Sequence, residues 1–293
     1  MGGIFVFGLI IILIVFSYHS KQEPTQNQES VTEIVSTSTA SLVENVFQNT
    51  DCATASTSSN SSLSVESIKY SDYPWDTKTI EEKSTHANVD IQYPQFTGGD
   101  IVAKLNRCVY TLISSVLNSD KEMVAEIAKD DPKDYKASPW DSSVDLTSTY
   151  NVVGINNGIV SLEIVITDFT GGGNGNHDES YPINWDLKSN RLLGPSDIFC
   201  SKDYISTLMP LVRKQIIDNF NQDNDFLVHP LPDDIIQWVN TGTSNDPNNW
   251  KYFLIRADGL VVIFQPYQVT SGAGGIVRAF IPDSTEPHFL CLP

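Results

Sequence analysis

The stretch STYNVVGINNGIVSLEIVITDF, residues 148 to 169, decides the fold. Two runs rich in apolar and β-branched residues flank Asn157-Gly158, and an Asn-Gly pair between such runs is the strongest short hairpin signal. We therefore predict strands over residues 144–155 and 159–169, joined by a tight turn. An antiparallel hairpin of this length needs a hydrophobic layer on at least one face, so helices or further strands must cover it.

The rest of the chain supplies such elements. Apolar residues at three- and four-residue spacing predict helices, and alternating or apolar runs between turn residues predict strands. These patterns predict strands over 88–93, 180–187, 252–256, 260–264 and 276–281, and helices over 101–117, 119–128, 203–220 (with a break or kink at Pro210) and 233–239. A second hairpin turn is expected at Asp258-Gly259. Strands joined mostly by hairpins, with helices grouped between them, predict an α+β fold: an antiparallel sheet built from hairpins with helices packed on it.

The N-terminal residues 4–16 (IFVFGLIIILIVF) form an apolar run interrupted by Gly8. The run has the length of the hydrophobic part of a signal peptide, and extended to Tyr18 it could cross a thin bilayer. We expect residues 1–17 to be a signal peptide, or residues 4–18 to be an N-terminal membrane anchor. Both alternatives predict an exported protein, in the periplasm or at the cell surface.

A Ser/Thr-rich segment follows over residues 18–68, with the low-complexity stretch CATASTSSNSS at 52–62. Such a composition cannot bury enough apolar area to order itself, which predicts a flexible linker. The folded region is then expected over residues 69–293, in two halves, 69–180 and 181–293.

The charge of the chain is strongly negative, with 18 Lys and Arg against 36 Asp and Glu and a formal charge of −18. One lysine and six acids lie in the linker from Lys21 to Ile68, so the folded region keeps −13. This charge disfavours nucleic acid and anionic lipid and favours cationic partners. Contact with a membrane is expected only through the N-terminal segment.

The four cysteines, Cys52, Cys108, Cys200 and Cys291, are far apart and show no CxxC spacing. In an exported chain they predict disulfides, with three possible pairings. Cys108 lies on the apolar face of its predicted helix, so it could also be a small buried thiol.

The stretch FTGGGNGNHDES, residues 169–180, opens directly off the central hairpin. A phosphate site would need a helix after the glycines, but a Pro-containing strand follows. Loops at sheet ends often carry binding residues, although a wide turn without a ligand remains the alternative. The binding-loop candidates are Gly171, Gly172, Gly173, Asn174, Gly175, Asn176 and His177, together with Tyr267, Gly272, Gly274 and Gly275.

Other classes of site lack their sequence patterns. His86, His177, His229 and His288 show none of the spacings of a zinc site, and no GxSxG motif accompanies a nucleophile. The acidic run after Asn221 lacks the Gly and Glu that a calcium loop requires. We therefore predict no catalytic residue, metal or cofactor.

Three blocks, in order, resemble the RsiV-like family of bacterial envelope domains. They are VDIQYPQFTG at 89–98, the segment 150–199 around the glycine loop and INWDLKSNRLLGPSDIF, and DGLVVIFQPYQVTSGAGGIVRAFIP at 258–282. Asn174 stands where the family's loop usually has histidine, and Ser271-Gly272 replaces a more usual Pro-Tyr. The departure at Asn174 puts any histidine-dependent role of the loop in doubt.

The resemblance implies an extracytoplasmic α+β domain without known catalytic activity. The family includes an anti-sigma factor whose outer domain binds lysozyme, and the non-catalytic portion of some peptidoglycan deacetylases. Because only a few residues precede the apolar run, we do not expect the sigma-binding function here.

The leading hypothesis is an exported binding module without catalysis, whose partner is lysozyme, another cationic protein or peptidoglycan. One alternative is a cell-wall hydrolase or deacetylase accessory, with Asp178 and Glu179 as the nearest carboxylate pair. Another is a structural envelope protein with no soluble ligand.

Overall fold

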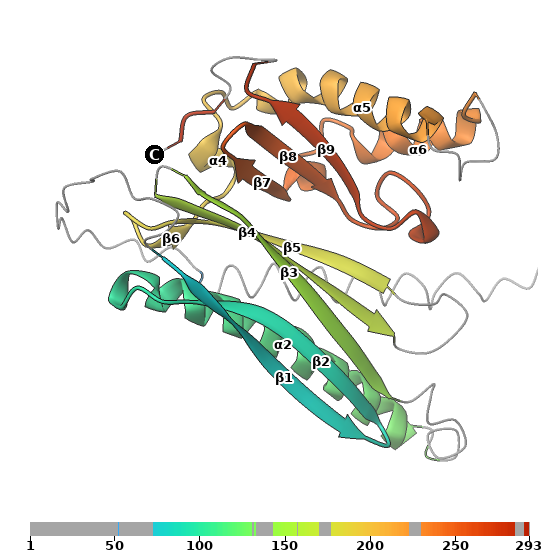
Figure 1. Ribbon diagram of the computed structural model, residues 1–293. Coiled ribbons are helices and arrows are strands. Elements are labelled where there is room, and N and C mark those ends of the chain that lie inside the picture. The colour runs from blue at the N-terminus through green and yellow to red at the C-terminus, as the bar shows by residue number, and fades with distance from the viewer. Residues whose placement is uncertain are drawn as a thin grey trace, which may run out of the picture. The chain divides into compact units, whose positions relative to one another are not determined.

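The structure is a computed structural model that describes residue 52 and residues 73–292, apart from 131, 133–142, 157, 170–176, 223–229 and 285–289. The described elements lie in one compact unit (Figure 1). They are β1 (Trp75–Ser84), β2 (Ala87–Phe96), α2 (Asp100–Asp130), β3 (Val144–Asn156), β4 (Ile159–Phe169), β5 (His177–Asp186), β6 (Arg191–Leu192), α4 (Pro195–Ile198), α5 (Tyr204–Gln222), α6 (Asp233–Gly242), η2 (Pro247–Trp250), β7 (Phe253–Arg256), β8 (Gly259–Phe264), η3 (Gly272–Gly274) and β9 (Val277–Pro282).

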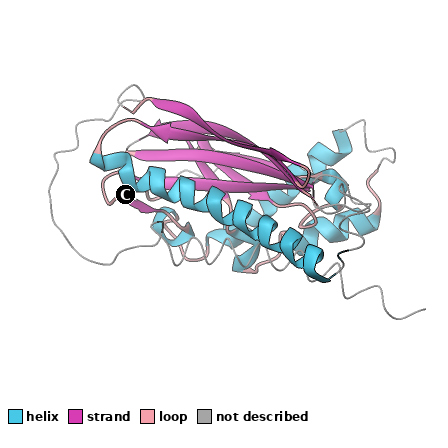
Figure 2. Cartoon of the chain, turned by 90° about the horizontal axis from the view of Figure 1, so that it is seen from below, coloured by secondary structure: helices cyan, strands magenta, loops and turns pink. Residues whose placement is uncertain are grey.

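Two sheets form the framework. Six strands pair in the order β1-β2-β3-β4-β5-β6, and three pair in the order β7-β8-β9. All neighbours run antiparallel except β2 and β3, which are parallel. A parallel pair needs a crossover connection, and α2 provides it, lying along one face of the larger sheet (Figure 2). The predicted α+β class with a mainly antiparallel sheet is confirmed.

The layers follow the order helix, sheet, sheet, helices, with α2 and α5 on the outside (Figure 1). One face of the smaller sheet packs on α5 and α6, and the other packs toward Val153 of the larger sheet. Because both faces are covered, the strand residues of β8 form a continuous buried apolar run. α5 continues as one helix through Pro210, where we predicted a break or kink.

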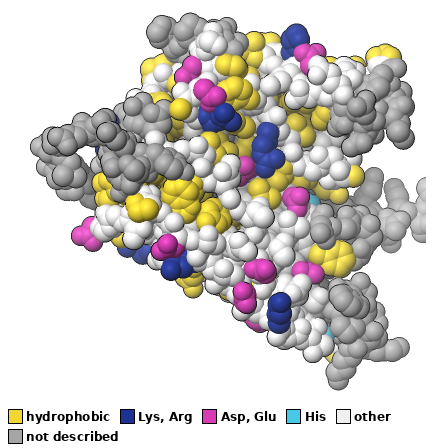
Figure 3. All heavy atoms as spheres, viewed as in Figure 1, with side chains coloured by type: hydrophobic (Ala, Val, Ile, Leu, Met, Phe, Trp, Pro, Cys, Tyr) yellow, Lys and Arg dark blue, Asp and Glu magenta, His cyan; other side chains and the backbone are white. Residues whose placement is uncertain are grey.

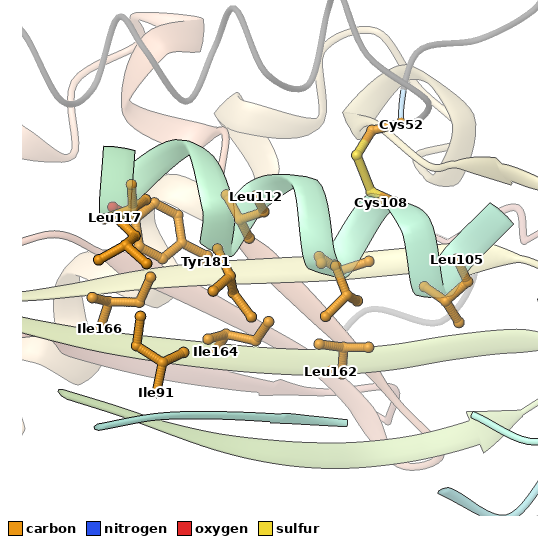
Figure 4. Packing of buried hydrophobic residues seen from close by; sticks show 14 of the residues in the cluster. Cys52, Ile91, Leu105, Cys108, Leu112, Leu117, Leu162, Ile164, Ile166 and Tyr181 are labelled. Carbon is orange, nitrogen blue, oxygen red and sulfur yellow. A yellow bond between two sulfur atoms is a disulfide. The ribbon is translucent and has the colours of Figure 1, made fainter. Parts of the chain in front are cut away.

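The main core lies between α2 and the larger sheet (Figure 4). Side chains at helical spacing on α2 meet alternate residues of the strands, as expected for an amphipathic helix on a pleated surface. Fully or almost fully buried members include Leu105, Leu112, Leu117, Ile91, Leu162, Ile164, Ile166 and Tyr181.

The prediction of two separate helices over 101–117 and 119–128 was wrong, because α2 is one helix of 31 residues. Ser119 and Asp120 form a local start signal, but the apolar stripe continues past them to Val124, which is buried. Packing of the whole stripe on the sheet outweighs this local preference.

Both predicted hairpins are present. β3 and β4 pair up to Asn156 and Ile159, and Gly158 has a φ of 83°, as a tight turn requires; Asn157 lies outside the described residues. In the second hairpin, Arg256 pairs with Gly259, so the turn lies one residue earlier than predicted. A Cβ on Gly259 would lie 2.2 Å from the Ile281 carbonyl oxygen, which explains the glycine there.

β2 continues through Pro94, where we expected the strand to end. On its β3 side, Ser148 binds the backbone of Gln92, and Asn106 of α2 binds the backbone of Phe96. The backbone nitrogen of Pro94 faces the same side, where pairing with β3 has ended at Asp90. No β3 carbonyl therefore lacks a donor because proline has no N–H. β1, whose side chains are mostly exposed, was not predicted from the sequence.

Two side-chain amides join the sheets. The Asn184 amide donates to the Phe253 carbonyl at 2.7 Å, and its oxygen accepts from the Ile255 N–H at 3.0 Å. In return, the Gln265 side chain accepts from the Ser180 N–H and donates to the Ser180 carbonyl at 2.6 Å. We call these two residues the amide clasp. Each amide supplies the donor and acceptor that a neighbouring strand would otherwise provide.

Two disulfides resolve the pairing that the sequence left open: Cys52–Cys108 and Cys200–Cys291. Cys108 is therefore a disulfide partner on α2 and not a buried thiol (Figure 4). The disulfides fit an oxidising compartment outside the cytoplasm. The predicted signal or anchor at 1–18 and the linker around Cys52 lie outside the described residues; within the described part, no helix is long and apolar enough to cross a membrane.

Candidate functional site

One end of the larger sheet gathers polar side chains on the face that α2 covers. Asp168 of β4 pairs directly with His177 of β5, and Ile166 pairs with Glu179. Residues paired in this way point to the same face, and Ile166 belongs to the core beneath α2. The strand register therefore places Asp168, His177 and Glu179 together under the second half of α2.

His177 lies between the two carboxylates. Its Nδ1 is 3.4 Å from Oδ1 of Asp168 and 4.0 Å from Oε1 of Glu179. The hydrogen bond to Asp168 raises the pKa of His177, partial burial opposes this, and the nearby carboxylate charges raise it further. The imidazole therefore acts as the cation of the group when it is protonated.

Glu179 also accepts a hydrogen bond from the Tyr181 hydroxyl. Tyr181 is 3% exposed and sits in the core, and burial, followed by the charge of Glu179, raises its pKa well above the usual value. The phenol thus remains a neutral donor that holds the Glu179 carboxylate in position.

A third carboxyl group comes from α2. Asp120 is 5% exposed, and burial together with the charges of Asp168 and Glu179 raises its pKa to about 7. No described residue donates a hydrogen bond to this carboxyl, and only burial and charge act on its pKa. We call Asp120, Asp168 and Glu179 the carboxylate cluster.

An exposed tyrosine borders the cluster from the other end of the chain. Tyr267 is 49% exposed and stacks on His177, with ring centroids 6.3 Å apart and an angle of 22° between the planes. Its backbone has a φ of 66°, which is unusual for a bulky residue, and its carbonyl accepts from Trp238 Nε1 at 2.9 Å. The fold thus holds the backbone of Tyr267 in a strained conformation.

The glycines of the second candidate loop support this arrangement. A Cβ on Gly272 would lie 2.2 Å from the Tyr267 ring, and one on Gly274 would lie 2.5 Å from the Thr270 side chain. Gly275 has a φ of 63° with open space beside it. Gly272 is therefore needed for close packing against Tyr267, and Gly274 for close packing against Thr270.

The structure brings His177 and Tyr267 together from the two loops that the sequence singled out. The remaining candidates of the first loop, Gly171, Gly172, Gly173, Asn174, Gly175 and Asn176, lie outside the described residues.

The carboxylate pair named for an enzymatic alternative does not come together. Asp178 and Glu179 are consecutive strand residues, so their side chains point to opposite faces. Asp178 accepts a hydrogen bond from Thr167 at 2.6 Å on the face away from α2. Glu179 instead contacts Tyr181 and His177 on the face that α2 covers.

Asp120 and Asp168 were not among the candidate residues predicted from the sequence. Asp120 carried a usable signal, because it occupies a position of the apolar stripe, three residues after Leu117 and four before Val124. Burial of an acid at such a position costs free energy unless the carboxyl is paired or hydrogen-bonded. Asp168 carried none, since one acid near a strand end is common.

Among the described residues, no three or more His, Cys, Asp or Glu side chains are arranged to hold a metal ion.

The distribution of surface charge does not by itself identify a site. On the face seen in Figure 3, acidic side chains are scattered among uncharged ones, and several lie beside Lys or Arg. The carboxylate cluster differs because its ion pairs among described residues involve only His177.

Two segments of the chain match known protein families. Residues 80–177 match the family described as Deacetylase PdaC, and residues 196–284 match the family described as Protein of unknown function (DUF3298). No curated protein matches the sequence. These two matches are compatible with the RsiV-like resemblance, which remains a prediction.

One solved structure supports the fold. A member of the DUF3298 family from Bacteroides fragilis NCTC 9343 aligns with 18% identity and a TM-score of 0.52, covering 75% of this chain and 94% of the other. A DUF3298 family protein from Pseudomonas aeruginosa PAO1 aligns with 12% identity and a TM-score of 0.46, covering 75% and 96%. The chain thus contains a segment similar to PdaC followed by one similar to DUF3298, in a fold that the Bacteroides protein shares.

Proposed function

We propose that the protein is an exported envelope module without catalytic activity that binds a cationic protein, with a c-type lysozyme as the leading candidate. The observation that carries this proposal is the stacking of Tyr267 on His177 beside the carboxylate cluster. It joins two loops 90 residues apart, both of which the sequence had marked for binding.

Tyr267 has the properties of an interface residue. Exposed aromatic rings that are held rigidly make large contacts at low entropic cost, and tyrosine is enriched among residues that dominate binding energy. A backbone held at a φ of 66° persists only when surrounding contacts impose it, as Trp238 and Gly272 do here.

Charge supports a cationic partner. The chain's formal charge of −18 would attract a basic protein over long range, mainly by raising the association rate at low salt. The carboxylate cluster adds a local negative group beside the exposed ring. The two disulfides and the family matches are consistent with a domain of the cell envelope.

Calorimetry on the full-length oxidised protein in a nonionic detergent, titrated with a c-type lysozyme, tests the proposal. The titration is run at about 0.1 M and about 0.5 M salt, because exposed charge attraction is largely screened at the higher concentration. We expect saturable 1:1 binding that survives the higher salt. Binding that vanishes with salt would reduce the interaction to nonspecific charge attraction.

The chain provides a matched control for the site. Tyr110 on α2 is 52% exposed, close to the 49% of Tyr267. Tyr267→Ala should weaken binding by about tenfold or more, as for a central interface tyrosine, while Tyr110→Ala should leave it unchanged. Equal effects of the two substitutions would reject the proposed surface. Sedimentation with purified peptidoglycan tests the cell wall as the ligand. If the protein binds neither lysozyme nor peptidoglycan, the remaining alternative is a structural envelope protein.

A second candidate function is a part of a wall-modifying enzyme, which the match of residues 80–177 to Deacetylase PdaC favours. Release of acetate from purified peptidoglycan, measured between about pH 5 and 9 to span the titration of carboxyl and imidazole groups, tests it. Release that is lost in Asp168→Asn would establish catalysis and overturn the non-catalytic proposal.

A further inference from the structure

The carboxylate cluster holds more negative charge than its surroundings neutralise. Asp120, Asp168 and Glu179 contribute three acids, and His177 is the cation that pairs with the latter two among the described residues. Side-chain exposure is 23% for Asp168, 19% for Glu179 and 38% for His177, so the group is reached from the surface at His177.

Asp120 is the residue that this internal pairing leaves unexplained. It is 5% exposed, the charges of Asp168 and Glu179 raise its pKa, and no described residue donates a hydrogen bond to it. A buried carboxyl without a donor is costly, and a hydrophobic residue would serve the α2 stripe better. A ligand that donates hydrogen bonds and carries positive charge would satisfy it.

We infer that the carboxylate cluster is a binding site for one guanidinium or ammonium group, presented by an Arg or Lys side chain of the partner. The inference deepens the proposed function and rests on it, because it names the group of a cationic protein that the site takes. A guanidinium fits best, since it offers five N–H donors in a plane and can reach the Asp168 and Glu179 carboxylates that flank His177 Nδ1. Tyr267, stacked on His177, provides an aromatic face for the same cation.

His177 acts as the resident cation that the ligand replaces. Its Nδ1 occupies the position between Asp168 and Glu179 that an incoming N–H group would need. The incoming cation also favours the ionised form of Asp120. Binding near pH 7 should therefore release protons from the protein, from His177 and from Asp120.

The titratable groups that face this site come from each element around it. Asp120 lies on α2, Asp168 on β4, and His177, Glu179 and Tyr181 on β5, with Tyr267 in the loop before η3. Tyr181 remains neutral, since its pKa is raised well above the usual value. Proton release near pH 7 therefore reports His177 and Asp120.

The test uses a small probe, N-acetyl-arginine amide, with N-acetyl-citrulline amide as an uncharged control of the same shape. The full-length oxidised protein is titrated near pH 7, and the imidazole NMR signal of His177, assigned with His177→Gln, is followed. We expect a saturable shift in the millimolar range with the arginine compound, typical of a single charge-assisted contact. The citrulline compound should give none.

The protein offers a matched pair of variants. Asp168→Asn should weaken the response by about tenfold, while Asp178→Asn removes the same charge from the opposite face of the sheet and should change it less than about twofold. Calorimetry in phosphate and in Tris buffer, which differ in ionisation enthalpy, should show proton release that Asp120→Asn reduces.

Several outcomes would overturn the inference: no saturable response to the arginine compound, an equal response to citrulline, or equal loss in the two Asp→Asn variants. Lysozyme binding that Asp168→Asn leaves intact would reject the cation site while the proposed function stands. A response to the arginine compound without lysozyme binding would support the site and reject that partner.

Discussion

Replacement of Asp120 by asparagine should make the protein more stable, and by an amount that grows with pH. The native carboxyl is buried beside Asp168 and Glu179, so its ionised form is disfavoured. Asparagine has nearly the same shape, carries no charge and brings an N–H₂ group that can donate to the two neighbouring carboxylates.

The magnitude follows from the pKa. Folding raises the pKa of Asp120 from 3.8 to about 7, and one pKa unit corresponds to about 1.4 kcal/mol, so the full penalty is about 4 kcal/mol. Between these two values the unfolded chain has lost the proton while the folded protein keeps it, so native stability falls as pH rises. Asp120→Asn should therefore add about 4 kcal/mol at pH 8 and about 2 kcal/mol at pH 5.

Urea unfolding followed by tryptophan fluorescence, at constant ionic strength from pH 5 to 8, measures this difference. Trp185 and Trp250 are both buried and report the two halves of the core. Asp178→Asn serves as the control, because it removes a carboxylate of the opposite face and should show no comparable rise with pH. A gain from Asp120→Asn that is equal at the two pH values, or larger at pH 5, would refute the reasoning.

Three further substitutions test other parts of the structure. Asn184→Ala removes half of the amide clasp and leaves two buried backbone groups of β7 unpaired, so calorimetric melting should show a loss of about 3 kcal/mol; a change below about 0.5 kcal/mol would show that water replaces the amide. Cys108→Ala removes the disulfide to Cys52, which closes a loop of 56 residues, and should lower the free energy of unfolding by about 4 kcal/mol in a denaturant titration. After reduction, the variant and the wild-type protein should unfold at the same denaturant concentration. Because the pKa of His177 is raised, its stabilisation is present at low pH and is lost as pH rises through that pKa, so His177→Gln should lower the Tm at about pH 5.5 and hardly at about pH 9; the opposite trend would contradict the assigned ion pairs.

The predictions from sequence succeeded where local chemistry decides the structure. Asn157-Gly158 lies between two apolar runs, and the register of β3 and β4 next to the turn follows directly from it; an irregularity between Val152 and Gly154 then shifts the register by one residue. α5 and α6 were also predicted from the sequence, because their apolar residues recur at regular helical spacing.

Long-range packing accounts for the misses. The continuation of α2 past Asp120 depends on a sheet whose strands lie elsewhere in the chain. β1 has mostly polar, exposed side chains and is held by pairing with β2, so its own residues carry little strand signal. The disulfide pairing likewise depends on three-dimensional proximity, which spacing alone does not contain.

The same distinction applies to the candidate site. The two loops were recognised from their glycines and from Tyr267, but the carboxylate cluster is assembled from three elements by the register of β4 and β5 and the rotation of α2. Only Asp120, as an acid in an apolar stripe, could have been recognised as unusual from its sequence position.

The amide clasp has a consequence for the protein outside the single molecule. A sheet edge with free N–H and C=O groups can recruit a strand from another chain, which is a route to aggregation. Asn184 occupies the outer edge of β7 and Gln265 that of β5, at Ser180. Two side chains that hold the sheets together thereby also block both edges against a strand from another chain, which suits a protein whose two disulfides fit an oxidising compartment without cytoplasmic chaperones.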